Sequence, residues 1–142
     1  MDTPPRLVGV DYGARRVGLA VADPLGLFAR PLGTYAPGEA LTALAALHQR
    51  EGIGTVVVGW PLGEDGREGA AVDRIRPFLG RVRKLLPGVQ VEVYDETLSS
   101  RRAVAQLVAA GASRKRRQRG AVDAAAACVI LQDWLDERVD DA

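Results

Sequence analysis

The order of the predicted elements places this chain in the α/β class, with a mixed five-stranded sheet and helices on both of its faces. Two short apolar runs open the chain on either side of a turn, which predicts a pair of antiparallel strands. Later apolar runs alternate with stretches of helical periodicity, which predicts parallel strands joined by crossover helices. An antiparallel opening and later crossover units can share a single sheet.

The opening strands surround the first candidate site residue. The apolar run at 7–10 predicts a short buried strand, the run at 17–22 predicts a second one, and together they predict a hairpin around residues 12–16. Asp11 therefore ends the first strand. A carboxylate at that place can face a cleft while the sheet holds it to within about half an ångström, as a catalytic ligand requires. It also fits a simpler role as the cap of the turn beside Gly13.

The middle of the chain supplies an edge strand and the first crossover unit. Residues 30–35 predict a weak third strand at the sheet edge, because Pro31 and Gly33 suit an edge better than the sheet interior. Residues 39–50 predict a helix with one apolar face, and the continuous apolar run at 55–60 predicts a buried parallel strand.

The remainder of the chain continues the alternation. Apolar residues at spacings of three and four predict a helix over residues 68–86, which Pro77 should either kink or break. Residues 89–94 alternate as a strand, and a helix that ends at Gly111 follows. The last predicted helix, over residues 121–137, is rich in alanine in its early turns.

The composition is that of a soluble globular protein. The 142 residues predict a single domain over residues 1–142, with 47% hydrophobic and 26% charged residues. The amino terminus lacks the apolar segment of a signal peptide, and no apolar run approaches the roughly 20 residues of a membrane span. A single cysteine excludes an internal disulfide bond and fits a reducing compartment. We therefore expect a cytoplasmic protein with no membrane contact.

The charges are balanced in number but not in position. The chain has 19 basic and 18 acidic residues, for a net charge of +1, yet residues 114–119 alone carry +5, which leaves −4 for the rest. Such a dense block can gather anions, and nucleic acid above all, although a solvated loop or helix start can also carry one. Its cations are Arg114, Lys115, Arg116, Arg117 and Arg119.

Elimination narrows the chemistry to carboxylates. One histidine and one cysteine cannot build an ordinary zinc site. His48 lies in the middle of a predicted helix, and Cys128 lies among alanines, where it fits a small buried hydrophobic residue better than a nucleophile. Neither a phosphate-binding P-loop sequence nor a dinucleotide-binding G-x-G-x-x-G sequence is present. Oxygen ligands select hard cations such as Mg²⁺ or Mn²⁺.

Three carboxylates stand at element ends with apolar neighbours. Asp11 ends the first strand, Glu96 follows the last strand and Asp123 opens the final helix. Asp133 and Asp136 lie at least ten residues further along that helix, which is about 15 Å along its axis and too far to share a metal. The first three carboxylates suggest a metal cluster. Two ions about 3.5–4 Å apart would activate water and stabilise the leaving oxygen in phosphodiester cleavage.

Motifs that follow one another along the whole chain carry a resemblance to a known family. The chain resembles the YqgF family, whose members are described as pre-16S rRNA nucleases and as Holliday-junction-resolvase-like proteins. The resemblance covers essentially the whole chain. It is carried by residues 8–23 (VGVDYGARRVGLAVAD), 56–62 (VVVGWPL) with Gly66, 95–100 (DETLSS), and 122–127 (VDAAAA) after the basic block and 130–136 (ILQDWLD) beyond it.

The resemblance implies a ribonuclease H-like fold and a nuclease that uses divalent metals. By motif it points to Asp11, Glu96 and Asp123 as the catalytic, metal-binding residues. The chain departs from the family at Thr97, where the family commonly has Arg, and this removes one cation beside the site. In this fold the last strand is not next to the first, so Glu96 must reach across, and Asp95 remains an alternative ligand.

Cations flank the candidate carboxylates. Arg15 and Arg16 follow Asp11 closely, and the 114–119 block directly precedes Asp123. These cations would draw a polyanionic backbone towards acidic residues that otherwise repel it, and five phosphate contacts on a duplex would give a salt slope of about −4.5. Trp60 ends a strand, where it could stack on a base, although packing at the rim of the core is the simpler role.

The leading interpretation is a metal-dependent nuclease acting on structured nucleic acid, with maturation of the 5′ end of pre-16S rRNA as the function that the resemblance favours. A resolvase-like nuclease that cuts branched DNA, and acts as a two-fold dimer, is one alternative, although no segment identifies an interface. A non-catalytic RNA-binding module is another. Actin-like ATPases and sugar kinases also open with an Asp after a first strand, but they need two such domains and Ser/Thr-rich phosphate turns.

Overall fold

The computed structural model describes residues 4–13, 15–61, 67–95 and 120–141, and within the last range the side chains of residues 124–138. Its elements follow the predicted order. They are strands β1 (Arg6–Tyr12), β2 (Val17–Ala22) and β3 (Ala29–Tyr35), helix α1 (Pro37–Glu51), strand β4 (Ile53–Trp60), helix α2 (Ala70–Leu85), strand β5 (Gln90–Asp95) and helix α5 (Gly120–Asp141).

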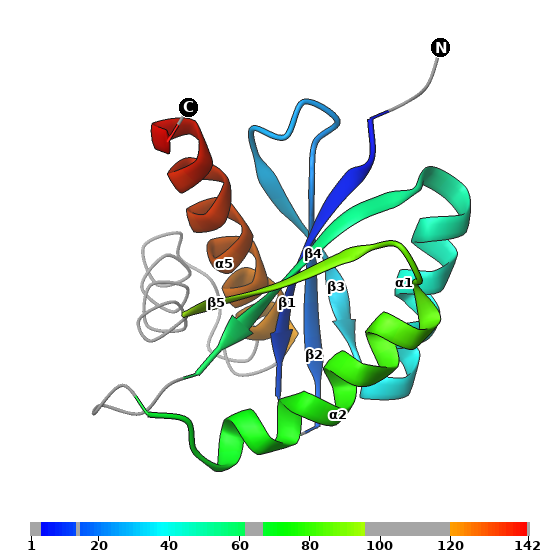
Figure 1. Cartoon of the computed structure of the whole chain (residues 1–142), viewed down its shortest axis with the longest axis vertical. Helices are drawn as coiled ribbons and strands as arrows, with labels where there is room; N and C mark the ends of the chain where they lie inside the picture. Colours follow the sequence, from blue (N-terminus) through cyan, green and yellow to red (C-terminus); the bar gives the residue numbers. More distant parts are fainter. Residues whose placement is uncertain (1–3, 14, 62–66, 96–119, 142) are drawn as a thin grey trace.

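The strands form one mixed sheet in the order β3-β2-β1-β4-β5 (Figure 1). Strands β1, β2 and β3 pair antiparallel, whereas β1 and β4, and β4 and β5, pair parallel. This confirms the predicted antiparallel opening followed by parallel strands. It also confirms that β4 separates the last strand from the first, and that the weak strand with Pro31 lies at an edge.

Alternate residues along each strand serve two different layers. Helices α1 and α2 cover one face of the sheet, and α5 covers the other (Figure 1). Val8 and Val10 of β1 belong to the α1/α2 core, whereas Leu7 packs with the α5 core. The α5 core is smaller; its buried members are Ala20, Ala22, Val57, Ala127, Ile130, Leu131, Trp134 and Leu135.

Gly9 sets the distance between α5 and the sheet. A Cβ atom at position 9 would lie 2.7 Å from the Cβ of Leu131 and 2.8 Å from the carbonyl oxygen of Ala127. Both distances are under 3.0 Å, which is closer than Cβ atoms approach other heavy atoms in proteins. The helix can therefore approach β1 this closely only because position 9 carries no side chain.

The helix bounds differ from the predictions at a few positions. Helix α1 starts two residues earlier than expected, because Pro37 occupies the first helical position, where its missing N–H is not needed. Helix α2 continues through Pro77, which resolves whether this proline breaks it. Helix α5 extends four residues beyond the predicted end, to Asp141. The predicted helix that ends at Gly111 lies outside the described residues.

Candidate active site at the carboxyl end of strand β1

Asp11 lies on the face of the sheet that α5 covers. Residues 7, 9 and 11 alternate to the same side of β1, and both Leu7 and Gly9 contact the α5 layer. The side chain of Asp11 is half-buried and engaged in an interaction. The strand thus directs this carboxylate towards α5 and holds it on a rigid element of the fold.

Two glycines leave room around Asp11. Gly18 of β2 is its direct partner in the antiparallel register. On the other side, the parallel register pairs Val10 with Val58, so the next residue of β4, Gly59, lies level with Asp11. Neither neighbouring strand therefore extends a side chain beside the carboxylate. The sequence alone did not identify these glycines as part of the site, although glycine inside a buried strand signals the close approach of a ligand or another backbone.

Helix α5 runs antiparallel to β1, so its amino-terminal turns lie towards the carboxyl end of that strand (Figure 1). Near the start of β1, Leu7 lines a groove together with Trp134 and Leu135. One alternation further on, Gly9 meets Leu131 and Ala127. Two strand residues advance about 6.6 Å, and one helical turn about 5.4 Å. The backbone of α5 at positions 123–127 is therefore level with Asp11.

Position 123 belongs to the helical stripe that faces the sheet. It precedes Ala127 by four residues and Ile130 by seven, and both of these are buried in the α5 core. The side chain of Asp123 lies outside the described residues. The structure places the backbone of residue 123 on the side of α5 that faces the sheet, close to the level of Asp11.

Alternation along β5 distinguishes the two candidate acids at its end. Tyr94 packs with the α5 core, and its hydroxyl donates a hydrogen bond of 2.6 Å to Glu137 Oε1. Val91 packs with the α1/α2 core. Asp95 shares the side of Val91, so it lies on the opposite face of the sheet from Asp11. Glu96, the next residue, lies outside the described residues.

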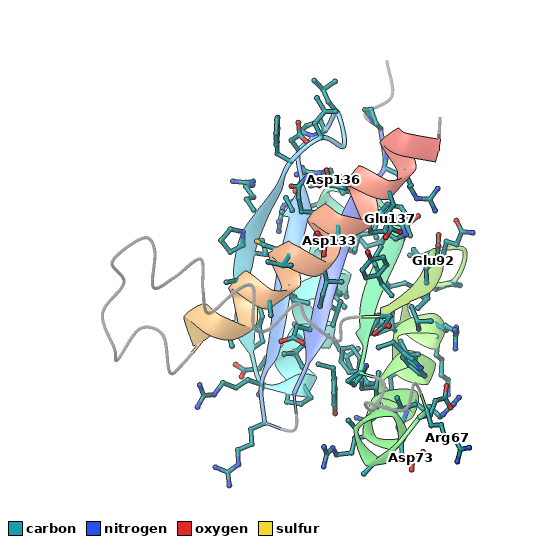
Figure 2. All side chains as sticks on the ribbon, turned by 90° about the vertical axis from the view of Figure 1, so that its left-hand side faces the viewer. Arg67, Asp73, Glu92, Asp133, Asp136 and Glu137 are labelled. Carbon is teal, nitrogen blue, oxygen red and sulfur yellow. The ribbon has the colours of Figure 1, made fainter. Side chains whose placement is uncertain are left out.

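The remaining acids of α5 lie away from this edge. Figure 2 shows Asp133, Asp136 and Glu137 in the C-terminal half of α5, where Glu137 accepts the hydrogen bond from Tyr94 of β5. Asp136 accepts a hydrogen bond of 3.0 Å from Gln132 Nε2. Among the described residues, no group of three His, Cys, Asp or Glu side chains is placed to hold a metal ion.

Arg15 and Arg16 occupy the hairpin turn beside the candidate site. The N–H of Gly13 donates a 2.8 Å hydrogen bond to the carbonyl oxygen of Arg16, which closes the turn. Arg15 is exposed and Arg16 is half-buried. Both cations therefore lie just beyond the end of β1, at the same edge of the sheet as Asp11. The 114–119 block lies outside the described residues.

Two residues with other potential chemistry have structural roles. His48 Nδ1 accepts a 2.9 Å hydrogen bond from the N–H of Ile53, which ties the end of α1 to the start of β4. Burial raises the pKa of the Cys128 thiol to about 11, so at neutral pH this thiol is protonated and a poor nucleophile. Both observations agree with a site built from carboxylates.

Trp60 is part of the core rather than of a base-stacking surface. Its side chain is 8% exposed, and its Nε1–H donates a 3.1 Å hydrogen bond to Glu68 Oε2. The guanidinium of Arg76 lies 5.4 Å from the centre of its ring. The packing role expected at the rim is therefore confirmed, and the stacking role is not supported.

Comparison with known proteins adds the family. The family model described as "RuvX: Holliday junction resolvase" matches residues 5–137. The chain belongs to the RuvX family. Two proteins named "Putative pre-16S rRNA nuclease" are similar to this RuvX-family chain. The protein from Salinibacter ruber is 48% identical over 137 residues, 96% of each chain, and that from Chlorobaculum tepidum is 43% identical over 132 residues, 92% of this chain and 93% of its own.

Solved structures agree on the architecture of the RuvX-family chain. Thermus thermophilus RuvC superposes with a TM-score of 0.58 at 20% identity, and RuvC from the same organism in complex with a Holliday junction substrate superposes with a TM-score of 0.54 at 19% identity. Each comparison covers 95% of this chain and 96% of the other. The predicted ribonuclease H-like fold is confirmed. The predicted YqgF family is the RuvX family, so the family prediction is confirmed as well. In the part of the chain that the structure describes, no helix has the length and hydropathy to cross a bilayer.

Proposed function

We propose that this chain is a divalent-metal-dependent nuclease that matures the 5′ end of pre-16S rRNA. The observation that carries the proposal is the place of Asp11. Its carboxylate stands at the end of the central strand, between two glycines, on the face where the first turns of α5 arrive. Membership of the RuvX family and the names of the similar proteins support the nuclease activity and the rRNA substrate.

Asp11, Glu96 and Asp123 would hold the metal. Asp11 fits because carboxylate oxygens suit Mg²⁺ and Mn²⁺, and because the two flanking strands place glycines, not larger side chains, at its level. Asp123 fits by its position on the sheet-facing stripe of α5. Glu96 is favoured over Asp95 because Asp95 lies on the opposite face of the sheet from Asp11. When bound, two such ions supply an activated water and stabilise the leaving oxygen of a phosphodiester.

The protein's own side chains contribute rigidity and charge. Asp11 pairs with Gly18 of β2, and Val10 before it pairs with Val58 of β4, so its carboxylate needs little reorganisation when the substrate arrives. Arg15 and Arg16, in the turn closed by Gly13, would hold phosphate oxygens at the same edge of the sheet. The cations of residues 114–119, next to Asp123 in the sequence, would offset the repulsion between RNA and the three acids.

The decisive experiment compares cleavage by the wild-type protein and by Asp11→Asn, with Mg²⁺ or Mn²⁺, on a precursor 16S rRNA fragment. Asp136→Asn is the matched control, because it makes the same change on an exposed residue of α5 away from this edge. We expect Asp11→Asn to lose more than the roughly 10–100-fold that removal of a residue beyond the direct ligands costs, and Asp136→Asn to cleave normally. Equal rates for Asp11→Asn and the wild type would refute the proposed site.

Further arms of the assay identify the third ligand and the substrate. Glu96→Gln should abolish cleavage, whereas Asp95→Asn should retain it; the reverse result would assign the ligand to Asp95. A four-way DNA junction is included because the family description names a Holliday junction resolvase. Faster cleavage of the junction than of the precursor rRNA would replace the rRNA substrate by branched DNA. Salt-dependent RNA binding with no metal-dependent cleavage would instead indicate an RNA-binding module.

A further inference from the structure

We propose that the exposed face of α2 is a second RNA-binding surface, which holds the sugar–phosphate backbone of the substrate where it leaves the active-site edge. We call this surface the α2 basic face and define it by Arg74, Arg81, Arg83 and Lys84. The inference rests on the proposed function for the identity of the substrate. The charges and contacts that carry it lie on the α1/α2 side of the sheet and are independent of Asp11.

The charge of α2 is strongly one-sided. Between Ala70 and Leu85 the helix has five basic residues and a single acidic one, Asp73. Arg76 forms an ion pair with Glu68. The four residues of the α2 basic face are exposed, and none has an ion pair or side-chain hydrogen bond within the described part of the chain. Four cations without acidic partners along one helix are typical of a surface that meets an anion.

Three of these four cations lie along one side of α2 and form a line rather than a point. Arg74 and Arg81 are seven residues apart, so they lie on the same stripe of α2, and Lys84 follows less than one turn later. From position 74 to position 84 the helix rises about 15 Å. Arg83 lies on the opposite flank of the exposed surface. An extended polyanion can contact charges arranged in this way, whereas a small anion could reach only one or two of them.

The surface is hollowed between α1 and α2. Arg81 and Lys84 line a depression of about 310 Å³, together with Leu41 of α1 and Leu85. Cations at the rim of a concave surface can contact a convex phosphate backbone from two sides. Leu41 and Leu85 are the apolar part of the lining, so the depression alone would also suit an acidic apolar peptide. The spread of charge along α2 favours the polyanion.

Helix α2 is directly connected to the active-site edge. It follows β4, so its amino-terminal end lies at the carboxyl edge of the parallel strands, where Figure 2 shows Arg67 and Asp73. The ring of Phe78 packs 4.8 Å from the ring of Tyr12, the residue after Asp11. A helix is about 10–12 Å across. RNA held by Arg15 and Arg16 in the hairpin turn would therefore have to span about one helix width to reach Arg74.

The test measures RNA affinity against salt. Anisotropy of a labelled precursor rRNA fragment is recorded over about 50–200 mM NaCl with Mg²⁺, in an Asp11→Asn background that prevents cleavage. The test variants are R74Q/R81Q and the quadruple R74Q/R81Q/R83Q/K84Q. The control is R50Q/R138Q, which removes two exposed cations that have carboxylate partners, at the end of α1 and near the end of α5. Circular dichroism melts verify that each variant folds, because cations also stabilise the C-terminal end of a helix.

We expect the magnitude of the salt slope to fall by about 0.7–0.9 for each cation, hence by about 1.5 for the double variant and about 3 for the quadruple. At about 100 mM salt the quadruple variant should bind RNA at least tenfold more weakly than the Asp11→Asn protein. The R50Q/R138Q control should bind RNA as the Asp11→Asn protein does. Slopes equal to the control in both test variants would overturn the inference.

Failure of the proposed function gives a different result. If wild type and Asp11→Asn cleave equally, or neither cleaves, the active-site proposal fails while the salt slopes still decide whether α2 binds RNA. If wild type alone cleaves and the quadruple variant keeps the full slope, the nuclease proposal stands and the α2 proposal fails.

Discussion

Substitution of Gly9 by alanine would test how α5 is positioned against the sheet. The added Cβ would lie 2.7 Å from the Cβ of Leu131 and 2.8 Å from the carbonyl oxygen of Ala127. Relief of these contacts requires α5 to move away from β1 by roughly 1 Å, because carbon atoms pack at about 3.5–4.0 Å. Neither contact atom belongs to the far end of a flexible side chain, so a rotamer change does not relieve the clash.

The expected cost follows from this displacement. Overpacking of a well-packed core typically costs about 1–3 kcal/mol in the free energy of unfolding. For a chain of this length each kcal/mol lowers the melting temperature by roughly 2–4 °C. The same displacement would shift the first turns of α5, and Asp123 with them, relative to Asp11. A misplacement of about 1 Å can reduce a rate by roughly a hundredfold, so activity should fall more than the loss of folded protein explains.

Gly80→Ala provides the matched control. Gly80 lies in the exposed part of α2, and a Cβ atom there would meet nothing within 4 Å. Alanine at this place should stabilise the helix by roughly 0.5–1 kcal/mol. Urea unfolding and cleavage assays on both variants give the comparison. A Gly9→Ala protein as stable and as active as the wild type would refute the argument that glycine sets the separation between α5 and β1.

Three further predictions concern single residues. The raised pKa of Cys128, about 11, predicts that iodoacetamide modifies the folded protein slowly at pH 8 and the urea-unfolded protein much faster; equal rates would contradict burial of the thiol. The backbone N–H of Phe28 and that of Leu27 donate hydrogen bonds to Asp23 and lower its pKa, so Asp23 should stabilise the fold above about pH 4 and lose this contribution as the pH falls through the lowered value. Acid titrations should therefore show a shallower loss of stability for Asp23→Ala than for the wild type. Trp60→Phe should bind RNA as the wild type does. Its free energy of unfolding should be lower by about 0.5–1.5 kcal/mol because the hydrogen bond to Glu68 is lost. Weaker RNA binding by the folded variant would instead support a stacking role for Trp60.

Local patterns in the sequence predicted most of the secondary structure, because side-chain burial follows the period of each element. Alternation identified β5, and spacings of three and four identified the buried stripe of α2. Pro31 predicted an edge strand correctly, since an edge strand tolerates a missing N–H. The single histidine and cysteine directed attention to carboxylates, and the structure gives both residues structural roles.

The effect of Pro77 could be decided only by the tertiary structure. A proline inside a helix costs about 3 kcal/mol. Helix α2 nevertheless buries five apolar side chains, each worth roughly 1.5–3 kcal/mol relative to exposure, so the packing outweighs the missing hydrogen bond. Pro77 itself is exposed and takes no part in that packing.

The sequence by itself determined the family, the element types and the three acids that we propose as ligands, because these depend on residue identity and local periodicity. The tertiary structure decided which residues are neighbours. Only the register places Gly18 and Gly59 beside Asp11, and only the alternation of β5 separates Asp95 from that face. Only the packed molecule leaves the four cations of the α2 basic face without acidic partners among the described residues, while Arg76 pairs with Glu68. These relations join residues far apart in the chain, and strand pairing and helix packing create them when the chain folds.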